Sequence, residues 1–239
     1  MIKIKDYINN NYVIDGNLTY ENINGVCVVN YDGTVLIKNT KIEKLTDGFV
    51  WGEVEGDFDC SYCKNLISLK GAPKKVKGNF DCIYCDKLKS LEGAPEKVEG
   101  NFDCSYCKNL TSLEGAPKFI AGTFNCSDCK NLISLEGAPE KIDGEFNCYN
   151  CDNLKSLEGA PKEVCRDFDC SGCKNLKSLE GSPEKIGRRF DCSYCSKLTS
   201  LKGASKEVGG DFNCSNCDNL KSLRGVTKKI GGKLISNKL

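Results

Sequence analysis

A unit of 22 residues recurs through most of the chain, and this period limits the folds that the chain can adopt. Its clearest marker is a phenylalanine, which occurs at Phe58, Phe80, Phe102, Phe124, Phe146, Phe168, Phe190 and Phe212. Each phenylalanine is followed by a C-x-x-C pair and then by two leucines that lie three residues apart. A fixed period of this length is typical of a solenoid, in which each unit buries its apolar face against its two neighbours.

The pattern inside one unit predicts a short strand followed by turns. In the segment "NFDCSYC", Phe102 and Cys104 alternate with Asn101 and Asp103, so phenylalanine and cysteine face inward. Apolar residues then recur at every third position, which allows at most one turn of 3₁₀-like helix before a Gly-Ala-Pro segment ends it. We therefore predict a repeat solenoid with one short parallel strand per coil, irregular backbone on the other face and little helix.

The same residues carry a resemblance to a known family. The run F-x-C-x-x-C-x-x-L from Phe102 to Leu110 resembles the strand and turn of a leucine-rich repeat, L-x-L-x-x-N/C-x-L. The fuller pattern "FDCSYCKNLTSLEGAP" is similar to short cysteine-containing leucine-rich-repeat proteins of bacteriophages and other large viruses. The resemblance covers about residues 34–236 and implies a leucine-rich-repeat-like scaffold. It also implies a viral or phage protein that acts on a host component.

The ends of the chain read as caps. The segment "GVCVVNYDGTVLIKN" (25–39) predicts two strands joined by a hairpin turn, and 34–55 copies the repeat imperfectly, with Asn39 in place of the second cysteine. Residues 1–55 are thus expected to form an N-terminal cap with a hairpin and a degenerate first coil. Residues 56–230 hold eight repeats, and 231–239 a capping strand and tail.

Composition excludes several classes of function. The chain has 34 lysines and arginines against 33 aspartates and glutamates, so no net charge attracts it to nucleic acid or to a membrane. It has no histidine, which removes Cys-His and Ser-His catalysis and imidazole-containing zinc sites. With no signal peptide and no apolar run of membrane-spanning length, we expect a non-enzymatic protein without a cofactor in the reducing cytoplasm.

Sixteen of the 18 cysteines form two columns. They are Cys60, Cys63, Cys82, Cys85, Cys104, Cys107, Cys126, Cys129, Cys148, Cys151, Cys170, Cys173, Cys192, Cys195, Cys214 and Cys217. Because they keep phase with the apolar columns, we favour buried structural thiols, with the second of each pair bonding the turn backbone in place of asparagine. The spacing C-x2-C-x18-C-x2-C leaves two alternatives open, zinc or iron–sulfur loading with a storage or redox role, and disulfides. Cys165 lies outside both columns and is expected to be the most reactive thiol.

The residues beside each phenylalanine should point outward and form an acidic strand face. Nine are acidic, namely Asp57, Asp59, Asp81, Asp103, Glu145, Asp167, Asp169, Asp191 and Asp211. Since stacked carboxylates repel one another, this face is interpreted as a site for a protein with a basic surface, or for Ca²⁺; solubility is the alternative. Nucleic acid is disfavoured there by charge.

Four tyrosines follow on the adjoining turn, Tyr62, Tyr84, Tyr106 and Tyr194. They are candidate anchors for the same partner, and the alternative is that they only shield the cysteine turn.

The array departs from its pattern where Arg166 and Arg188 replace a recurrent glycine, with Arg189 alongside. Because the first two are 22 residues apart, the three should cluster as a candidate contact for phosphate or carboxylate, unless they are ordinary repeat drift. A further alternative for the whole chain is a structural rod that self-associates through the solenoid ends.

Overall fold

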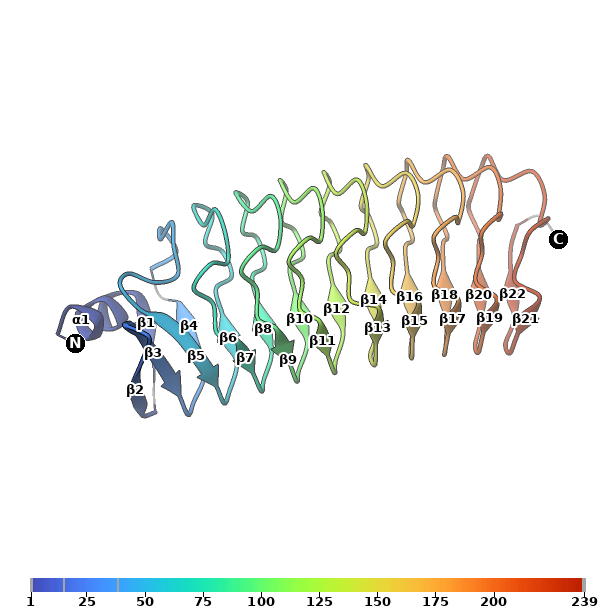
Figure 1. Ribbon diagram of the computed structural model, residues 1–239. Helices are drawn as coiled ribbons and strands as arrows, with labels where there is room; N and C mark the ends of the chain where they lie inside the picture. Colours follow the sequence, from blue (N-terminus) through green and yellow to red (C-terminus); the bar gives the residue numbers. More distant parts are fainter. Residues whose placement is uncertain (1, 15, 38, 238–239) are drawn as a thin grey trace.

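The computed structural model describes residues 2–14, 16–37 and 39–237 and is a β-solenoid of about nine turns with a period of 22 residues (Figure 1). The coils are stacked along one axis, and the two ends of the chain lie at opposite ends of the stack. The solenoid, its period and its short parallel strands are as the sequence predicts.

The phenylalanine strands form one sheet along the whole stack. Its eleven strands are ordered β1-β4-β6-β8-β10-β12-β14-β16-β18-β20-β22. Their bounds are β1 Tyr12–Val13, β4 Val35–Ile37, β6 Phe58–Asp59, β8 Phe80–Asp81, β10 Phe102–Asp103, β12 Phe124–Asn125, β14 Phe146–Asn147, β16 Phe168–Asp169, β18 Phe190–Asp191, β20 Phe212–Asn213 and β22 Leu234–Ile235. All pairs are parallel and in register except β1 with β4, which is antiparallel, so that Phe102 lies beside Phe80 and Phe124. We call this the phenylalanine sheet.

Each repeat also contributes a second strand, where the sequence predicts irregular backbone. These strands are β7 Lys75–Val76, β9 Lys97–Val98, β11 Phe119–Ile120, β13 Lys141–Ile142, β15 Glu163–Val164, β17 Lys185–Ile186, β19 Glu207–Val208 and β21 Lys229–Ile230. Sheet β11-β9-β7-β5-β3-β2 holds the first three, and sheet β13-β15-β17-β19-β21 holds the rest. Here β2 is Leu18–Ile23, β3 is Val26–Tyr31 and β5 is Val50–Val54. The prediction of one strand per coil is therefore wrong, because each second strand has a single inward residue, such as Val76 or Ile120, and so shows no alternation in the sequence.

The N-terminal hairpin lies earlier in the chain than expected. Strands β2 and β3 pair antiparallel around Asn24 and Gly25, whose φ angles of 53° and 83° suit a tight hairpin turn. Strand β4 pairs with β6 in the phenylalanine sheet, whereas β3 pairs with β5 in another sheet. The segment 25–39 therefore passes from one sheet to the other, and the predicted hairpin is wrong. Lys38, and residues 238–239 of the tail, lie outside the described residues.

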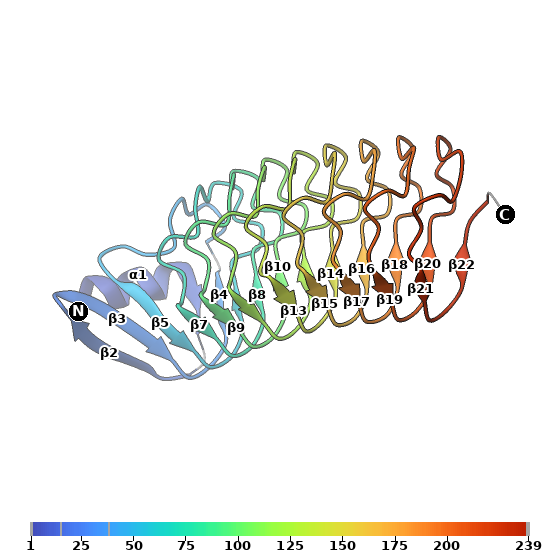
Figure 2. The same ribbon diagram turned by 45° about the vertical axis from the view of Figure 1, so that its right-hand side comes forward.

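Helix α1 (Ile2–Asn11) covers the first coil at the N-terminal end of the stack (Figure 2). Ile8 is fully buried, and the Tyr12 ring packs edge-on against Trp51 at 5.3 Å between ring centroids. Helices long and apolar enough to cross a bilayer are not found in the described part of the chain.

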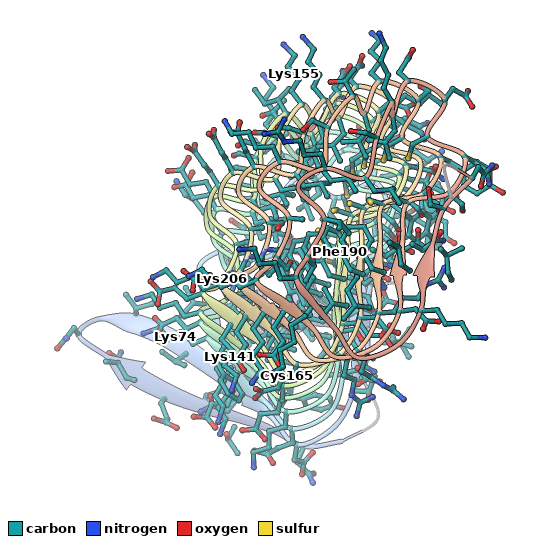
Figure 3. The ribbon with its side chains drawn as sticks, turned by 90° about the vertical axis from the view of Figure 1, so that its right-hand side faces the viewer. Lys74, Lys141, Lys155, Cys165, Phe190 and Lys206 are labelled. Atoms are coloured by element: carbon teal, nitrogen blue, oxygen red, sulfur yellow. The ribbon has the colours of Figure 1, made fainter. Side chains whose placement is uncertain are left out.

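The core consists of in-register columns of identical side chains. The phenylalanines, both cysteine columns, the first leucine column and the inward valines or isoleucines are buried in nearly every repeat. Neighbouring phenylalanine rings lie 5.0–5.5 Å apart, stacked near Phe58 and edge-on at Phe190. Looking along the stack, Figure 3 shows Phe190 inside the coil, whereas Lys141 and Cys165 lie on the outer surface.

Candidate functional site

The two cysteine columns are tied to the backbone of neighbouring coils. In every pair after the first, the thiol of the second cysteine donates to the carbonyl of the first cysteine one coil earlier, as Cys107 Sγ does to the Cys82 oxygen at 3.2 Å. The other donors are Cys85, Cys129, Cys151, Cys173, Cys195 and Cys217, at 3.1–3.3 Å. The thiol therefore acts as the backbone-directed donor that the sequence predicts at this position.

Burial suppresses thiolate formation at several cysteines of these columns. Loss of solvation raises the pKa of Cys60, Cys104 and Cys170 well above the ordinary value, and that of Cys63 to about 12. The thiolate is the form that attacks electrophiles and binds metals, so this environment opposes both reactions. All cysteines are free in the structure, and no three or more cysteines, aspartates or glutamates among the described residues are arranged to hold a metal ion.

The acidic residues of the strand face are less exposed than expected. Eight of the nine are half-buried, and Asp191 is buried. One column, just before each phenylalanine, bonds to the backbone of the following coil. Asp57 Oδ1 accepts the Asn79 N–H at 2.6 Å, and Asp167 and Asp211 do the same for Arg189 and Lys233 at 2.8 and 2.7 Å. These three aspartates therefore have a structural role, which is to bond the backbone of the next coil. No such bond is found for the Glu145 side chain among the described residues.

The second column, just after each phenylalanine, stabilises the turn that follows. Asp59 Oδ1 accepts the Ser61 N–H at 2.8 Å, and Asp103, Asp169 and Asp191 accept the corresponding serine N–H at 2.8–2.9 Å. Repulsion between coils is relieved where asparagine alternates with aspartate. Asn125 Nδ2 donates to Asp103 Oδ2 at 2.8 Å, and Asn213 Nδ2 donates to Asp191 at 3.1 Å.

Three carboxylates remain stacked in the first three repeats. Asp59, Asp81 and Asp103 lie side by side in the register of β6, β8 and β10, and no described lysine or arginine forms an ion pair with them. Burial, followed by repulsion from Asp59 and Asp103, raises the pKa of Asp81 to about 7. Like charges at this spacing destabilise a sheet.

The tyrosines of the same coils occupy a backbone conformation that suits other residues. Tyr62, Tyr84 and Tyr106 have φ angles of 61°, 57° and 58°. Other coils place Asp128, Asn150, Gly172 and Asn216 at this left-handed position. Those residue types adopt positive φ more readily than tyrosine.

The three tyrosine rings form a stack. Ring centroids lie 5.2 Å apart between Tyr62 and Tyr84 and 4.6 Å apart between Tyr84 and Tyr106. Tyr62 is 56% exposed and Tyr106 36%. Tyr194 has a φ of 58° and is 62% exposed, but its column neighbours are Gly172 and Asn216.

Acidic and aromatic columns coincide in the first three repeats. Each tyrosine follows its aspartate by three residues, and Asp59 and Asp103 stabilise the turn between them. We name this set, comprising Asp59, Asp81, Asp103, Tyr62, Tyr84 and Tyr106, the acid–tyrosine stripe. All six residues were identified from the sequence, but not the fact that they occupy the same three successive repeats. Aligning the repeats would have shown this, since three aspartates follow one another in one column and three tyrosines in the other.

The three arginines do not form one cluster. The backbones of Arg166 and Arg188 are joined by the bond from Arg188 N–H to the Arg166 carbonyl at 3.1 Å, and both side chains are exposed. The Arg189 side chain instead forms an ion pair with Asp191 on the phenylalanine sheet. Cys165 is half-buried on the outer surface, with Sγ 3.8 Å from Asp143 Oδ1.

Two further features of the surface were not predicted from the sequence. Glutamates at 92, 114, 136, 158 and 180 form an exposed column on the turns, which the repeated "SLEG" could have revealed. A hollow of about 930 Å³ lies over β2, β3 and β5, and no short motif marks it. Comparison with protein-family models, curated proteins and solved structures found no match for this chain.

Proposed function

We propose that the protein is a non-enzymatic binding scaffold whose acid–tyrosine stripe holds a basic segment of a protein partner. One observation carries the proposal: two locally unfavourable choices, stacked carboxylates and left-handed tyrosines, fall on the same three coils. Residues that cost stability in the free protein and cluster on its surface are expected where a ligand compensates for them.

Several other coils of the chain carry residues that avoid carboxylate repulsion or suit the left-handed backbone position. Elsewhere, asparagine occupies the aspartate column at Asn125, Asn147 and Asn213, and the tyrosine column holds aspartate, asparagine or glycine in every later coil except that of Tyr194. Lysine or arginine side chains of a partner would neutralise the carboxylates and lie against the tyrosine rings through cation–π contacts, each worth about 0.5–1 kcal/mol at exposed sites. The exposure of Tyr62 and Tyr106 leaves both rings accessible to such a partner.

The proposal narrows the predicted acidic face to its first three repeats. Asp57, Asp167 and Asp211 bond to the backbone, and Arg189 pairs with Asp191, so these carboxylates have partners within the chain. The leucine-rich-repeat relationship, a viral or phage origin and a cytoplasmic location belong to the same proposal. The order of strand, cysteine turn and leucines supports the first, and the free buried thiols are compatible with a reducing compartment.

Binding of defined peptides tests the proposal. The probe is a fluorescein-labelled peptide of about ten residues rich in arginine and lysine, and an acidic peptide of equal length is its control. The triple variant Asp59→Asn, Asp81→Asn, Asp103→Asn should weaken binding of the basic peptide about 10- to 100-fold in fluorescence anisotropy, since each exposed charge pair contributes roughly 0.2–1 kcal/mol.

Matched substitutions in the last repeats give the control. Asp169→Asn with Tyr194→Asn changes the same columns away from the stripe and should leave peptide affinity unchanged. Replacing Tyr62, Tyr84 and Tyr106 by asparagine should weaken binding without removing any charge. Equal affinity of the wild-type protein and both stripe variants for the basic peptide would refute the proposal.

A further inference from the structure

The β2–β3 hairpin presents an unpaired strand edge. Strand β2 is the last strand of its sheet, and its six residues exceed the two residues of the strands in the repeats. Viewed along the stack, the hairpin extends beyond the outline of the coils (Figure 3). Its sequence, Leu-Thr-Tyr-Glu-Asn-Ile, contains neither the lysine nor the proline that commonly protects such an edge from pairing.

A shallow hollow with an apolar floor lies over the outer face of this hairpin. Ile23 pairs with Val26 across the two strands, and their side chains are 51% and 46% exposed. Val28 lies opposite Glu21 and also lines the hollow. The hollow continues over Gly52 of β5, which lacks a side chain and lies under Asn30.

The rim of the hollow is acidic. Four carboxylates, Glu21, Asp32, Glu53 and Glu55, line it against the single lysine Lys74. Glu53 and Glu55 pair with lysines outside the lining, whereas Glu21 and Asp32 accept hydrogen bonds from the neutral side chains of Asn30 and Asn17. An occupant of this hollow would therefore need apolar and basic side chains together.

We propose that the β2 edge accepts an extended segment of a partner protein, added to the sheet as a further strand, which turns both apolar and basic side chains toward the hollow. The backbone of the segment pairs with Leu18–Ile23. Since every second residue of a strand points to the same face, an apolar side chain packs against Ile23 and a basic side chain two residues away reaches Glu21. A second copy of β2 fits less well, because it would bring another glutamate to an acidic rim. This site lies on a different sheet from the acid–tyrosine stripe and does not depend on it.

The probe is a peptide of about eight residues with threonine at every other position and valine and lysine taking turns between the threonines, so that valine and lysine share one face; it is long enough to span β2. The same peptide with glutamate in place of lysine, and the same peptide with a central proline, are the controls. We expect the first peptide alone to bind, with an affinity that falls as salt rises, and to slow hydrogen exchange at the amides of residues 18–23.

Two exposed substitutions locate the site. Glu21→Lys should weaken binding at least about tenfold by reversing the rim charge, and Ile23→Lys should do so by placing a cation on the floor. Glu158→Lys changes the net charge equally on the exposed turn column and should leave affinity unchanged. Circular dichroism of each variant verifies that the fold is retained.

Two results would overturn the proposal. One is peptide binding that neither protects residues 18–23 nor responds to Glu21→Lys. The other is a protein dimer in sedimentation that Ile23→Lys dissociates, because the edge would then belong to a second copy of the chain.

Discussion

At the scale of single residues, the role of a side chain in the repeat depends on whether the backbone points it into the core or toward solvent. The cysteines of the repeat point inward, where each fills a small apolar space and the second also donates to a carbonyl of the preceding coil. The tyrosine inside the same C-x-x-C sits at positive φ and points outward. The conspicuous cysteines are therefore structural in this geometry, and the residue between them is the exposed one.

Burial of the thiols predicts their reactivity. In native protein, Ellman's reagent should react with Cys27 and Cys165, which are half-buried, and the other sixteen should react after unfolding in guanidinium. Metal analysis of the same sample distinguishes the zinc alternative. About four zinc ions per chain, at four thiolates each, would contradict the structural interpretation.

The left-handed tyrosines predict opposite effects at stacked and unstacked positions. Tyr194→Asn should raise the free energy of unfolding by about 0.5–1 kcal/mol, because asparagine tolerates positive φ and no ring stack is lost. Tyr84→Asn loses two ring contacts that together offset this gain, so little or no stabilisation is expected. Urea denaturation followed by circular dichroism measures both, and equal stabilisation of the two variants would argue against the role of stacking.

At the scale of elements, the unit of organisation is the column that runs from coil to coil. Charges just before the second strands β13, β15, β17 and β19 alternate in sign, so that Lys162 pairs with Glu140 at 3.0 Å and Lys206 with Glu184 at 2.7 Å. These lysines are thus neutralised by glutamates of the preceding coil. The first three aspartates of the phenylalanine sheet lack this alternation.

The stacked carboxylates predict a pH-dependent stability. The pKa of Asp81 is about 7 in the folded protein against an ordinary value of 3.8, so the folded state holds this proton more tightly. Stability should therefore fall as pH rises from about 4 to 7 and stay low above pH 7. Asp81→Asn should flatten this slope and raise the free energy of unfolding at pH 8 by about 1 kcal/mol, a value reduced for solvent screening of a partly exposed group.

The reverse substitution gives the matched test in the next coil. Asn125→Asp removes the hydrogen bond to Asp103 and extends the row of carboxylates, so it should lower stability at pH 8 more than at pH 4. Parallel denaturation curves at the two pH values measure both variants. A pH-independent effect of Asp81→Asn would exclude the proposed repulsion.

At the scale of the whole molecule, each coil is stabilised only by the coils beside it, so the ends need protection. Helix α1 and the aromatic group of Tyr12, Phe49 and Trp51 cover the N-terminal end of the stack. End-to-end growth into a rod would have to displace this cap, which weakens the self-assembly alternative relative to lateral binding.

Removing part of the cap should destabilise the adjoining coils first. Ile8→Ala is expected to lower the free energy of unfolding by about 2–4 kcal/mol, since Ile8 is fully buried. Hydrogen exchange should increase most at β5 and β6 and least near β20. Uniform exchange along the stack would instead indicate a fully cooperative solenoid. Size-exclusion chromatography of the wild-type protein tests the rod, which predicts assemblies larger than a monomer.

The solenoid, its 22-residue coil and the inward columns could be predicted from the amino-acid order alone, because they follow from a local periodicity that every repeat shows. The amino-acid order also predicted the backbone-bonding role of the second cysteine. The second strand of each coil, the position of the hairpin and the aspartates that bond to the next coil became visible in the folded chain and not before. These features depend on contacts between residues one coil apart. For the hairpin, they also depend on which sheet a segment joins once the coils have stacked. The same reason separates the stripe from the rest of the acidic face, since repulsion and ring stacking arise only when neighbouring coils come into register.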